Sequence, residues 1–261
     1  MPVVLVILAY DCSNPSCLSL GDKYGAFQLY VLSPTNVACK IPDDMSFESA
    51  VVLPLAANTA GYGLFKAGGI ELPKPSVDPK PSNKWILIYG GSTSNGMAAL
   101  QLARAAGVRV ITIASKKNHG LCRELGADIA IDYKDADWIA EATNQLRGKD
   151  VVGAYDAVGT DPTTKAMAQV LQTARFDAPI MSTGFIPEGI KGTLAFGTDV
   201  TKDEDLAKSL WIDFLPKALA SGSFVPKPDY EVVGHSLEDI QAAMDLQKKG
   251  VSAGKLVVKI S

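Results

Sequence analysis

The feature that most constrains the fold of this chain is a regular exchange of apolar, strand-length runs and helical patterns between residues 85 and 196. The runs are apolar throughout and do not alternate with polar residues, which is typical of strands covered on both faces. This exchange at βαβ spacing predicts an α/β fold, a doubly wound parallel Rossmann sheet with helices on both sides. The expected strands are 85–89, 108–114, 129–133, 151–158, 179–183 and 193–196, and the expected helices are 97–106, 117–125, 135–147 and 162–173.

The segment before this exchange is less regular. Residues 1–10 form an apolar run without a basic flank, so a buried strand is a better interpretation than a signal peptide. The run is also too short to span a membrane. Ser46 is a good N-cap for a helix that begins at Phe47 and continues, interrupted by Pro54, to Phe65. Two further short strands are expected at 27–32 and 37–41.

Two stretches outside the exchange remain to be placed. Residues 68–84 are rich in Pro, Gly, Ser and Lys, which predicts a surface connection without a packing role. The C-terminal part predicts a helix at 203–220, and then strand, helix and strand patterns that either extend the sheet or build a small second domain. These last patterns cover residues 229–233, 237–249 and 255–260.

A glycine loop, GGSTSNG, follows the first of the alternating strands and leads into a helix. Rossmann domains need this context, because a tight turn brings the backbone close to a pyrophosphate and the helix N-terminus offers it free N–H groups. Against the pattern G-x-G-x-x-G the loop supplies Gly91 and Gly96, with Thr93 in the middle place. No Lys-Ser or Lys-Thr pair ends the loop, so it is not a P-loop. The sequence predicts a dinucleotide site here, and a plain glycine-rich turn is the alternative.

The end of the second strand indicates which dinucleotide is bound. NAD-binding domains place an Asp or Glu there, about 20 residues on, to accept from the ribose 2′-OH. This chain instead has Ser115, Lys116, Lys117 and Asn118, and no carboxylate in this stretch would repel a 2′-phosphate. We therefore expect NADPH, with Ser115 and either Lys116 or Lys117 as phosphate ligands. The alternative is that the lysines only begin a solvated helix.

Composition argues against several other functions. A net charge of −3 and a pI near 5.5 give no electrostatic footprint for nucleic acid or an anionic membrane. Four scattered cysteines favour a reducing, cytoplasmic setting over a disulfide framework. Cys12 and Cys17 do not have a zinc spacing, and His119 and His235 are better explained as residues near helix starts. We expect no metal site, and the absence of a G-x-S-x-G motif gives hydrolase chemistry no support.

Several stretches together resemble the medium-chain dehydrogenase/reductase superfamily. They are YGGSTSNGMAALQLARAAG, ITIASKKNHGLCRELGADIAIDYKD, YDAVG, the ending GKLVVKI and the earlier GAFQLYVLSPTNVACKIPDDMSFESAVVLPLAANTAGYGLF. Within the superfamily they are similar to the zinc-independent branch of quinone oxidoreductases and, above all, to fungal trans-acting enoyl reductases of polyketide pathways. The resemblance covers residues 24–261.

The resemblance implies a set of cofactor-binding residues, while the catalytic residues stay unknown. The implied contacts are Gly91, Ser92, Thr93, Ser94, Asn95, Gly96 and Met97 for the pyrophosphate, Ser115, Lys116 and Asn118 for the 2′-phosphate, Tyr133 for the adenosine, Ala157, Val158 and Gly159 for the ribose, Thr59 for the nicotinamide, and Ser182, Thr183 and Gly184 for the far end of the cofactor.

The chain departs from the family at its start. Family members have a nearly complete GroES-like domain before the GAFQLYV stretch, whereas about two dozen residues precede it here. The implied division is a reduced remnant of the GroES-like β domain at 1–44, a Rossmann NADP-binding domain at 45–222, and a segment at 223–261 that returns to the substrate domain.

The resemblance implies an NADPH-dependent reductase of C=C bonds conjugated to a carbonyl, acting on a small-molecule or acyl-thioester substrate in fungal polyketide or other secondary metabolism. A homodimer, formed by pairing residues 193–196 across a two-fold axis, is also expected. The alternative is a truncated relative without hydride transfer, which acts as a binding or scaffold protein, or as an isomerase or cyclase. The proton donor stays open between solvent and four tyrosines, Tyr10, Tyr24, Tyr30 and Tyr62.

Overall fold

The computed structural model describes residues 33–260. The strands expected at 1–10 and 27–32 lie outside this range, and so does most of the expected GroES-like remnant. The same holds for Tyr10, Cys12, Cys17, Tyr24 and Tyr30.

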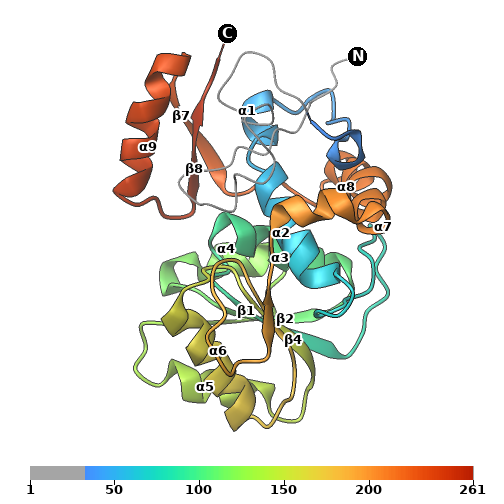
Figure 1. Ribbon diagram of the computed structural model, residues 1–261, viewed down its shortest axis with the longest axis vertical. Coiled ribbons are helices and arrows are strands. Elements are labelled where there is room, and N and C mark those ends of the chain that lie inside the picture. The colour runs from blue at the N-terminus through green and yellow to red at the C-terminus, as the bar shows by residue number, and fades with distance from the viewer. Residues whose placement is uncertain (1–32, 261) are drawn as a thin grey trace.

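A six-stranded sheet with every neighbouring pair parallel forms the lower half of the molecule (Figure 1). Its order, β3-β2-β1-β4-β5-β6, reverses direction between β1 and β4, which confirms the doubly wound prediction. Each strand overlaps its expected position, although most are shorter. The bounds are β1 Lys84–Tyr89, β2 Arg109–Ile113, β3 Ile129–Ile131, β4 Asp150–Asp156, β5 Ile180–Ser182 and β6 Gly192–Leu194.

Helices cover both faces of this sheet, and β1 shows why its sequence is apolar at every position. Ile86 and Ile88 pack into a core with residues of α2 and α3, whereas Trp85 and Leu87 pack into a second core with residues of α5 and α6. The helix bounds are α2 Pro54–Phe65, α3 Ser94–Ala105, α4 His119–Glu124 (preceded by the 3₁₀ turn η4 Lys116–Asn118), α5 Trp138–Leu146 and α6 Asp161–Thr173.

Two predictions about the segments around α2 are wrong. Residues 37–41 do not form a strand. Val37 is the last residue of a 3₁₀ turn, η3 Thr35–Val37, and the residues after it, which begin with an extended Ala38, have no ladder partner in the described range. The alternation that suggested a strand is real, since positions 37, 39 and 41 are buried, but burial alone does not supply a neighbouring strand. Residues 68–84 do have a packing role, because Ile70 and Leu72 are buried and Ile70 fills the space beside Gly153 of β4.

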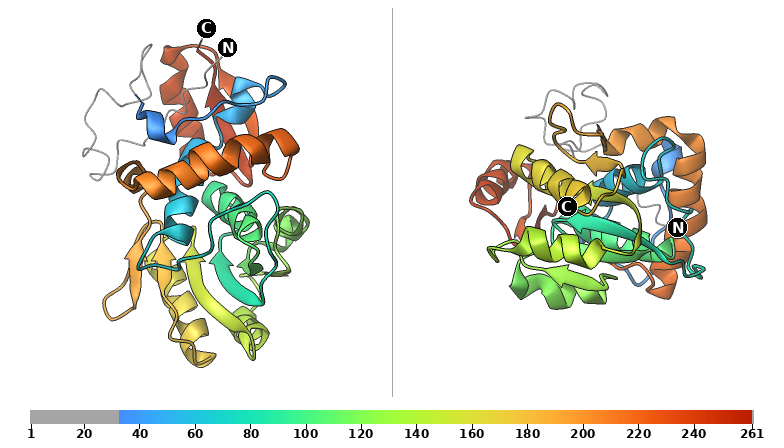
Figure 2. Two further views of the ribbon diagram at one scale, coloured as in Figure 1. Left: turned by 90° about the vertical axis from the view of Figure 1, so that its right-hand side faces the viewer. Right: turned by 90° about the horizontal axis from the view of Figure 1, so that it is seen from below.

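The helix expected at 203–220 is present, but its hydrogen bonding changes along its length. It consists of α7 Glu204–Ala207, a π-helical segment η6 Lys208–Phe214 and α8 Leu215–Ser221, which run as one rod (Figure 2). Asp203 caps it by accepting from the N–H of Leu206 at 3.0 Å. Pro216 offers a physical reason for the change, because its ring has no N–H and would clash with the carbonyl four residues earlier in a regular α-helix.

The C-terminal strands build a separate two-stranded sheet, which decides between the two alternatives left by the sequence. β7 Asp229–Gly234 pairs in parallel with β8 Gly254–Val258, and the 3₁₀ turn η7 Leu237–Asp239 and α9 Ile240–Lys248 connect them. The short helix α1 Phe47–Ala50 packs beside β7, with Ser46 as its N-cap as expected (Figure 1). An ion pair of 2.6 Å between Glu48 and Lys259 joins α1 to the residue after β8. Helices of the described range are all too short or too polar to cross a membrane.

Candidate functional site

The residues that the sequence associated with a cofactor lie on loops at one edge of the large sheet. The glycine loop follows β1, the Ser115–Asn118 stretch follows β2, Tyr133 follows β3 and Val158 follows β4. Because all these strands are parallel, their carboxyl ends meet at the same edge. The sheet also reverses its winding at β1 and β4, where ligands of open α/β sheets bind. The structure therefore brings four of the predicted groups to one edge.

The glycine loop is closely packed, and side chains would not fit at two of its glycines. A Cβ at Gly91 would collide with the hydroxyl of Thr112 on β2, and a Cβ at Gly96 would collide with the carbonyl oxygen of Gly90. Gly90, which was not among the residues predicted from the sequence, has a φ of +78°, a conformation that favours glycine. The Gly-Gly pair was the available signal. These contacts let the helix that follows pack directly on the turn.

Thr93, in the middle place of the fingerprint, caps the helix that follows. Its hydroxyl accepts a hydrogen bond of 3.0 Å from the N–H of Gly96, which makes it the N-cap of α3. The backbone around Thr93 is extended, as expected for a cap residue. The N-terminus of a twelve-residue helix is thus held open at the carboxyl end of β1, where its partial positive charge favours an anion.

A cavity of about 440 Å³ lies beside this loop. One wall comes from the Rossmann sheet and includes glycine-loop residues as well as residues after β2 and β3. The other wall comes from the C-terminal unit, which the sequence analysis did not connect with the cofactor. The lining residues are Ser92, Thr93, Ser94, Ser115, Lys117, Asn118, Tyr133, Lys134, Pro228, Gln247, Val251, Ser252, Ala253 and Gly254.

The cavity distinguishes between the two lysines that the sequence left as alternatives. Lys117 lines it and Lys116 does not, although both belong to the turn η4. Lys116 instead contributes its backbone N–H, which donates to the carboxylate of Asp132 at 3.1 Å. Ser115 is almost fully buried at the base of the same turn. The geometry thus favours Lys117 over Lys116 as the cation that faces a ligand.

Asp156 at the end of β4 holds the loop that contains Ala157, Val158 and Gly159. One carboxylate oxygen accepts from the N–H groups of Val158 at 3.0 Å and Gly159 at 2.9 Å. The other lies 2.7 and 2.8 Å from the hydroxyls of Thr163 and Thr164, which belong to α6. Asp156 is fully buried and makes no ion pair within residues 33–260. Asp156 stands within the YDAVG stretch, but its role as the anchor of this loop could not be predicted from the sequence.

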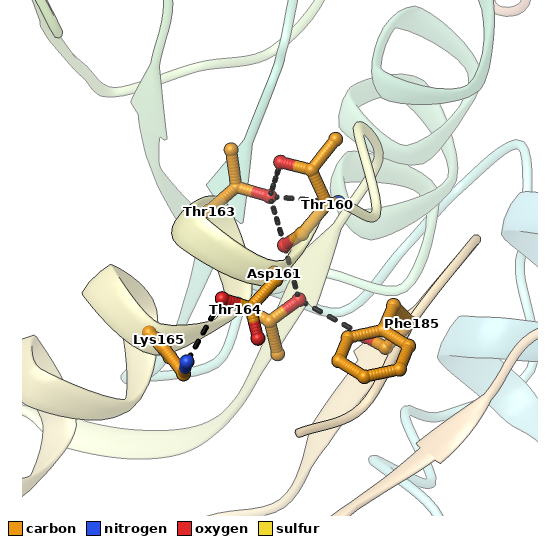
Figure 3. A network of polar contacts seen from close by, with 6 residues as sticks. All are labelled: Thr160, Asp161, Thr163, Thr164, Lys165 and Phe185. Atoms are coloured by element: carbon orange, nitrogen blue, oxygen red, sulfur yellow. Dashed lines mark hydrogen bonds and ion pairs between the residues drawn. The ribbon is translucent and has the colours of Figure 1, made fainter.

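The same network reaches the loop after β5. The hydroxyl of Thr164 lies 3.1 Å from the carbonyl oxygen of Phe185 (Figure 3). The N–H of Thr183 donates to the carbonyl of Asp156 at 3.0 Å. Gly159 and Gly184 touch so closely that a Cβ on either would collide with the backbone of the other. The predicted groups 157–159 and 182–184 are therefore neighbours, and Val158 in turn lies against Gly90.

Three predicted residues are placed less favourably for direct contact with a ligand. Ser182 is fully buried and its hydroxyl accepts from the N–H groups of Gly184 and Phe185, both at 3.4 Å. Met97 is fully buried within α3. Thr59 on α2 is 5% exposed, and its hydroxyl lies against Gly197 of the 3₁₀ segment η5 Gly197–Lys202. Their contacts with a cofactor stay predictions.

Among the candidate proton donors, only Tyr62 lies within the described range. It is nearly buried on α2, and Lys66 lies 5.5 Å from the centre of its ring. Burial first, and then the carboxylates of Asp199 and Asp203, raise the pKa of its hydroxyl. Tyr62 does not line the cavity.

Burial raises the pKa values of Cys39 and Cys122 to about 11, so both stay neutral thiols at neutral pH. Positions 33–260 contain no group of three or more His, Cys, Asp or Glu that could hold a metal ion.

Comparison with known proteins identifies the family. The sequence profile of the zinc-binding dehydrogenases matches residues 96–218. Dehydrogenase pigH of Monascus ruber is 37% identical over 267 aligned positions, which cover 90% of this chain and 72% of pigH. The chain belongs to the medium-chain dehydrogenase/reductase superfamily. It is therefore an oxidoreductase, as the resemblance implied.

Other relatives agree with this assignment. Trans-enoyl reductase himH of Aspergillus japonicus is 35% identical, and the match covers 90% of this chain and 69% of himH. Among solved structures, the enoyl reductase CurK superimposes with a TM-score of 0.65 at 20% identity, over 87% of this chain and 66% of CurK. A mycobacterial protein solved with NADPH gives a TM-score of 0.64 at 24% identity, over 90% of this chain and 71% of that protein. These two structures confirm the fold, and the chain spans about two thirds of their length.

Proposed function

We propose that this oxidoreductase uses NADPH to reduce C=C bonds conjugated to a carbonyl, in fungal polyketide or other secondary metabolism. The observation that carries the cofactor part is the cavity itself. It places the N-terminus of α3 and the glycine loop beside Ser115, Lys117 and Asn118. A pyrophosphate fits the first group and a ribose 2′-phosphate fits the second. Family membership supports a nicotinamide cofactor in general.

Two features of the glycine loop support this proposal. The close packing of Gly91 and Gly96 lets α3 begin directly after the turn. The loop residues Ser92, Thr93 and Ser94 line the cavity. Lys117 lines the cavity, and none of the other lining residues carries a carboxylate. A carboxylate in that lining would favour NADH, because it accepts from a free 2′-OH and repels a phosphate.

Each predicted segment would then have a distinct task. The N–H groups at the start of α3 bind the pyrophosphate, while Lys117 and Asn118 bind the 2′-phosphate. The loop held by Asp156 orients the part of the cofactor beyond the pyrophosphate, together with residues 182–184. When bound, NADPH supplies the hydride for the β-carbon of the activated alkene, and the protein supplies its position.

The substrate class is proposed from relatives. Three of them are named trans-enoyl reductases, himH, tndF of Aspergillus flavipes and traG of Penicillium crustosum. An enoyl thioester, or a small enone, is therefore the substrate that we propose for this chain. The cysteine pKa values argue against Cys39 and Cys122 as nucleophiles, which agrees with a reaction that needs no covalent intermediate.

Two measurements test the proposal in order. Calorimetry with NADPH and NADH should show binding of NADPH that is tighter by at least about tenfold, because a charge-assisted phosphate contact is worth about 1.5–3 kcal/mol. Absorbance of the reduced nicotinamide should then fall when an enone or enoyl thioester is added. Absence of NADPH binding would contradict both parts. Tight binding without oxidation, across a broad panel of enones and thioesters, would contradict the reductase part and favour a relative that has kept the nucleotide but lost hydride transfer.

A further inference from the structure

The cavity is lined by a second lysine besides Lys117. Lys134 follows β3, the strand next to β2, and it lines the same cavity as Lys117. Its ammonium nitrogen lies 6.0 Å from the centre of the Tyr133 ring, which also lines the cavity. Lys117 and Lys134 make no ion pair with a carboxylate of residues 33–260. Within that part of the chain, neither ammonium group is paired with a carboxylate.

One carboxylate joins the two turns that carry these lysines. Asp132 is 8% exposed at the end of β3. One of its oxygens accepts from the N–H of Lys116 at 3.1 Å, and the other accepts from the N–H of Lys134 at 3.0 Å. The bond from Lys134 is the largest cause of a pKa below the usual value for Asp132, so this carboxyl group stays ionised at neutral pH. The turn after β2 and the turn after β3 are thus fastened to the same group.

We propose that Lys117 and Lys134 form a two-cation site for the 2′-phosphate, and that Asp132 is the positioning residue that holds both turns in place. This inference rests on the proposed use of NADPH. A phosphate monoester carries a charge of about −1.5 to −2 at neutral pH, which one lysine does not balance. Two lysines, which follow the neighbouring strands β2 and β3, supply two positive charges to the lining of one pocket.

Asp132 has two opposite effects on the affinity of the site for a phosphate. Which of them is larger decides whether the affinity falls or rises when Asp132 is replaced. Its negative charge repels a phosphate, so its removal could raise affinity. Its hydrogen bonds keep Lys117 and Lys134 in position, so its removal should lower affinity. Both carboxylate oxygens are occupied by backbone N–H groups, which offsets part of the charge. We therefore expect positioning to dominate, because an Asn at this place can accept from one N–H group and leaves the other without its partner.

The test compares two ligands that differ only in the 2′-phosphate. Calorimetry with 2′,5′-ADP and 5′-AMP gives the preference for the phosphate as a ratio of dissociation constants. Lys134→Ala should lower that ratio about tenfold and leave 5′-AMP binding within about twofold, since the lost contact is charge-assisted. Asp132→Asn should lower the ratio as well. Lys84→Ala is the matched control, because it removes one exposed lysine at the opposite end of β1 and should change neither ligand.

The outcomes separate this inference from the proposed function. No preference for 2′,5′-ADP over 5′-AMP in the parent chain would overturn NADPH specificity itself. Where the parent chain shows that preference, an unchanged ratio for Lys117→Ala would overturn the two-cation site, because Lys117 is one of its two cations. A lower ratio for Lys117→Ala with an unchanged ratio for Lys134→Ala would overturn only the two-cation site. A higher ratio for Asp132→Asn would show that repulsion dominates and would overturn the positioning role. Thermal unfolding of each variant checks that the fold is intact. If Asp132→Asn does not fold, the ratio for Lys134→Ala still tests the two-cation site.

Discussion

At the scale of single residues, the glycine loop depends on the absence of one carbon atom. A Cβ at Gly96 would meet the carbonyl oxygen of Gly90, which belongs to the backbone and cannot rotate away. Gly96→Ala should therefore push α3 off the turn and cost about 1–3 kcal/mol of unfolding free energy, the usual range for overpacking. Cofactor affinity should fall with it. Chemical denaturation and calorimetry with NADPH measure the two effects.

Gly120 provides the control for this prediction. It lies in α4, a Cβ there would meet nothing within 4 Å, and its φ is not positive. Gly120→Ala should leave NADPH binding unchanged and raise stability by up to about 1 kcal/mol, because alanine favours a helix over glycine. Equal losses in both variants would mean that the contact with Gly90 does not matter.

The residues of the proposed 2′-phosphate site could be predicted from the sequence only in part. The sequence pointed to the stretch after β2 for the proposed site, because the missing carboxylate and the two lysines are visible in one strand end, and Ser115, Lys117 and Asn118 of this stretch do line the cavity. It could not choose between Lys116 and Lys117, since the turn decides which of two adjacent side chains faces the cavity. It also missed Lys134 and Asp132, because they follow a different strand and only the parallel pairing of β2 with β3 brings them close.

At the scale of elements, Asp156 at the end of β4 holds the start of α6 and the loop between them, and we call this contact the joint between β4 and α6. Its buried carboxylate has four partners, two backbone N–H groups and two threonine hydroxyls. Asp156→Asn replaces an acceptor oxygen with an N–H₂ group that cannot accept, so at least one buried donor loses its partner. We expect a loss of about 2–3 kcal/mol in unfolding free energy, measured by denaturant titration.

Asp161→Asn is the matched variant for that experiment. Asp161 begins the same helix, but its side chain is 47% exposed and pairs with Lys165 at 2.8 Å (Figure 3). A surface pair of this kind contributes less than about 1 kcal/mol. The effect of Asp156→Asn should therefore exceed that of Asp161→Asn. Similar small effects in both would show that the buried network is not what holds the joint.

The elements themselves were predicted well where their apolar runs are long and badly where pairing decides. The strands of the large sheet all lie where the sequence indicates. Strands β1, β2 and β4 are buried at most positions and are therefore mostly apolar, whereas the edge strand β6 is only partly buried. Residues 37–41 show the opposite case. Their alternating burial matches a strand, but a strand also needs a hydrogen-bonding neighbour, and none lies beside them within residues 33–260. The π-helical segment η6 was likewise invisible, since it reflects a local accommodation of the helix.

At the scale of the whole molecule, one ion pair ties the first described helix to the end of the chain. Glu48 on α1 lies 2.6 Å from Lys259, and the hydrogen bond from Lys259 is the main reason that the pKa of Glu48 is lowered. A carboxyl group with a lowered pKa in the folded state stabilises the fold above its unfolded pKa, and this contribution disappears as the pH falls through the folded pKa.

This pair should make the stability of the C-terminal unit depend on pH. Glu48→Gln should be less stable than the parent chain at neutral pH. The difference should shrink as the pH falls below the usual pKa of a glutamate and vanish below the lowered pKa of Glu48 in the folded state. Thermal unfolding across the acid range measures it, and high salt should reduce it at neutral pH because the pair is partly exposed. A difference that persists unchanged at low pH would mean that Glu48 acts through packing instead of charge.

The cavity has walls from two parts of the molecule, so a ligand within it should link their motions. The Rossmann sheet supplies one wall, and Pro228, Gln247 and residues 251–254 of the C-terminal unit supply the other. A ligand that contacts both walls binds only when they are in place, and at about 100 times its Kd it stabilises that state by about 2.7 kcal/mol.

NADPH should therefore slow amide hydrogen exchange in residues 251–254 as well as in the glycine loop. Helix α5 Trp138–Leu146 is the internal control, because it packs on the sheet and contributes no residue to the cavity. If slowing is confined to the glycine loop and the turn after β2, the C-terminal wall does not touch the cofactor. Equal slowing in residues 251–254, in the glycine loop and in α5 would instead indicate general stabilisation of the fold. Local protection by a ligand should be greatest where the ligand lies.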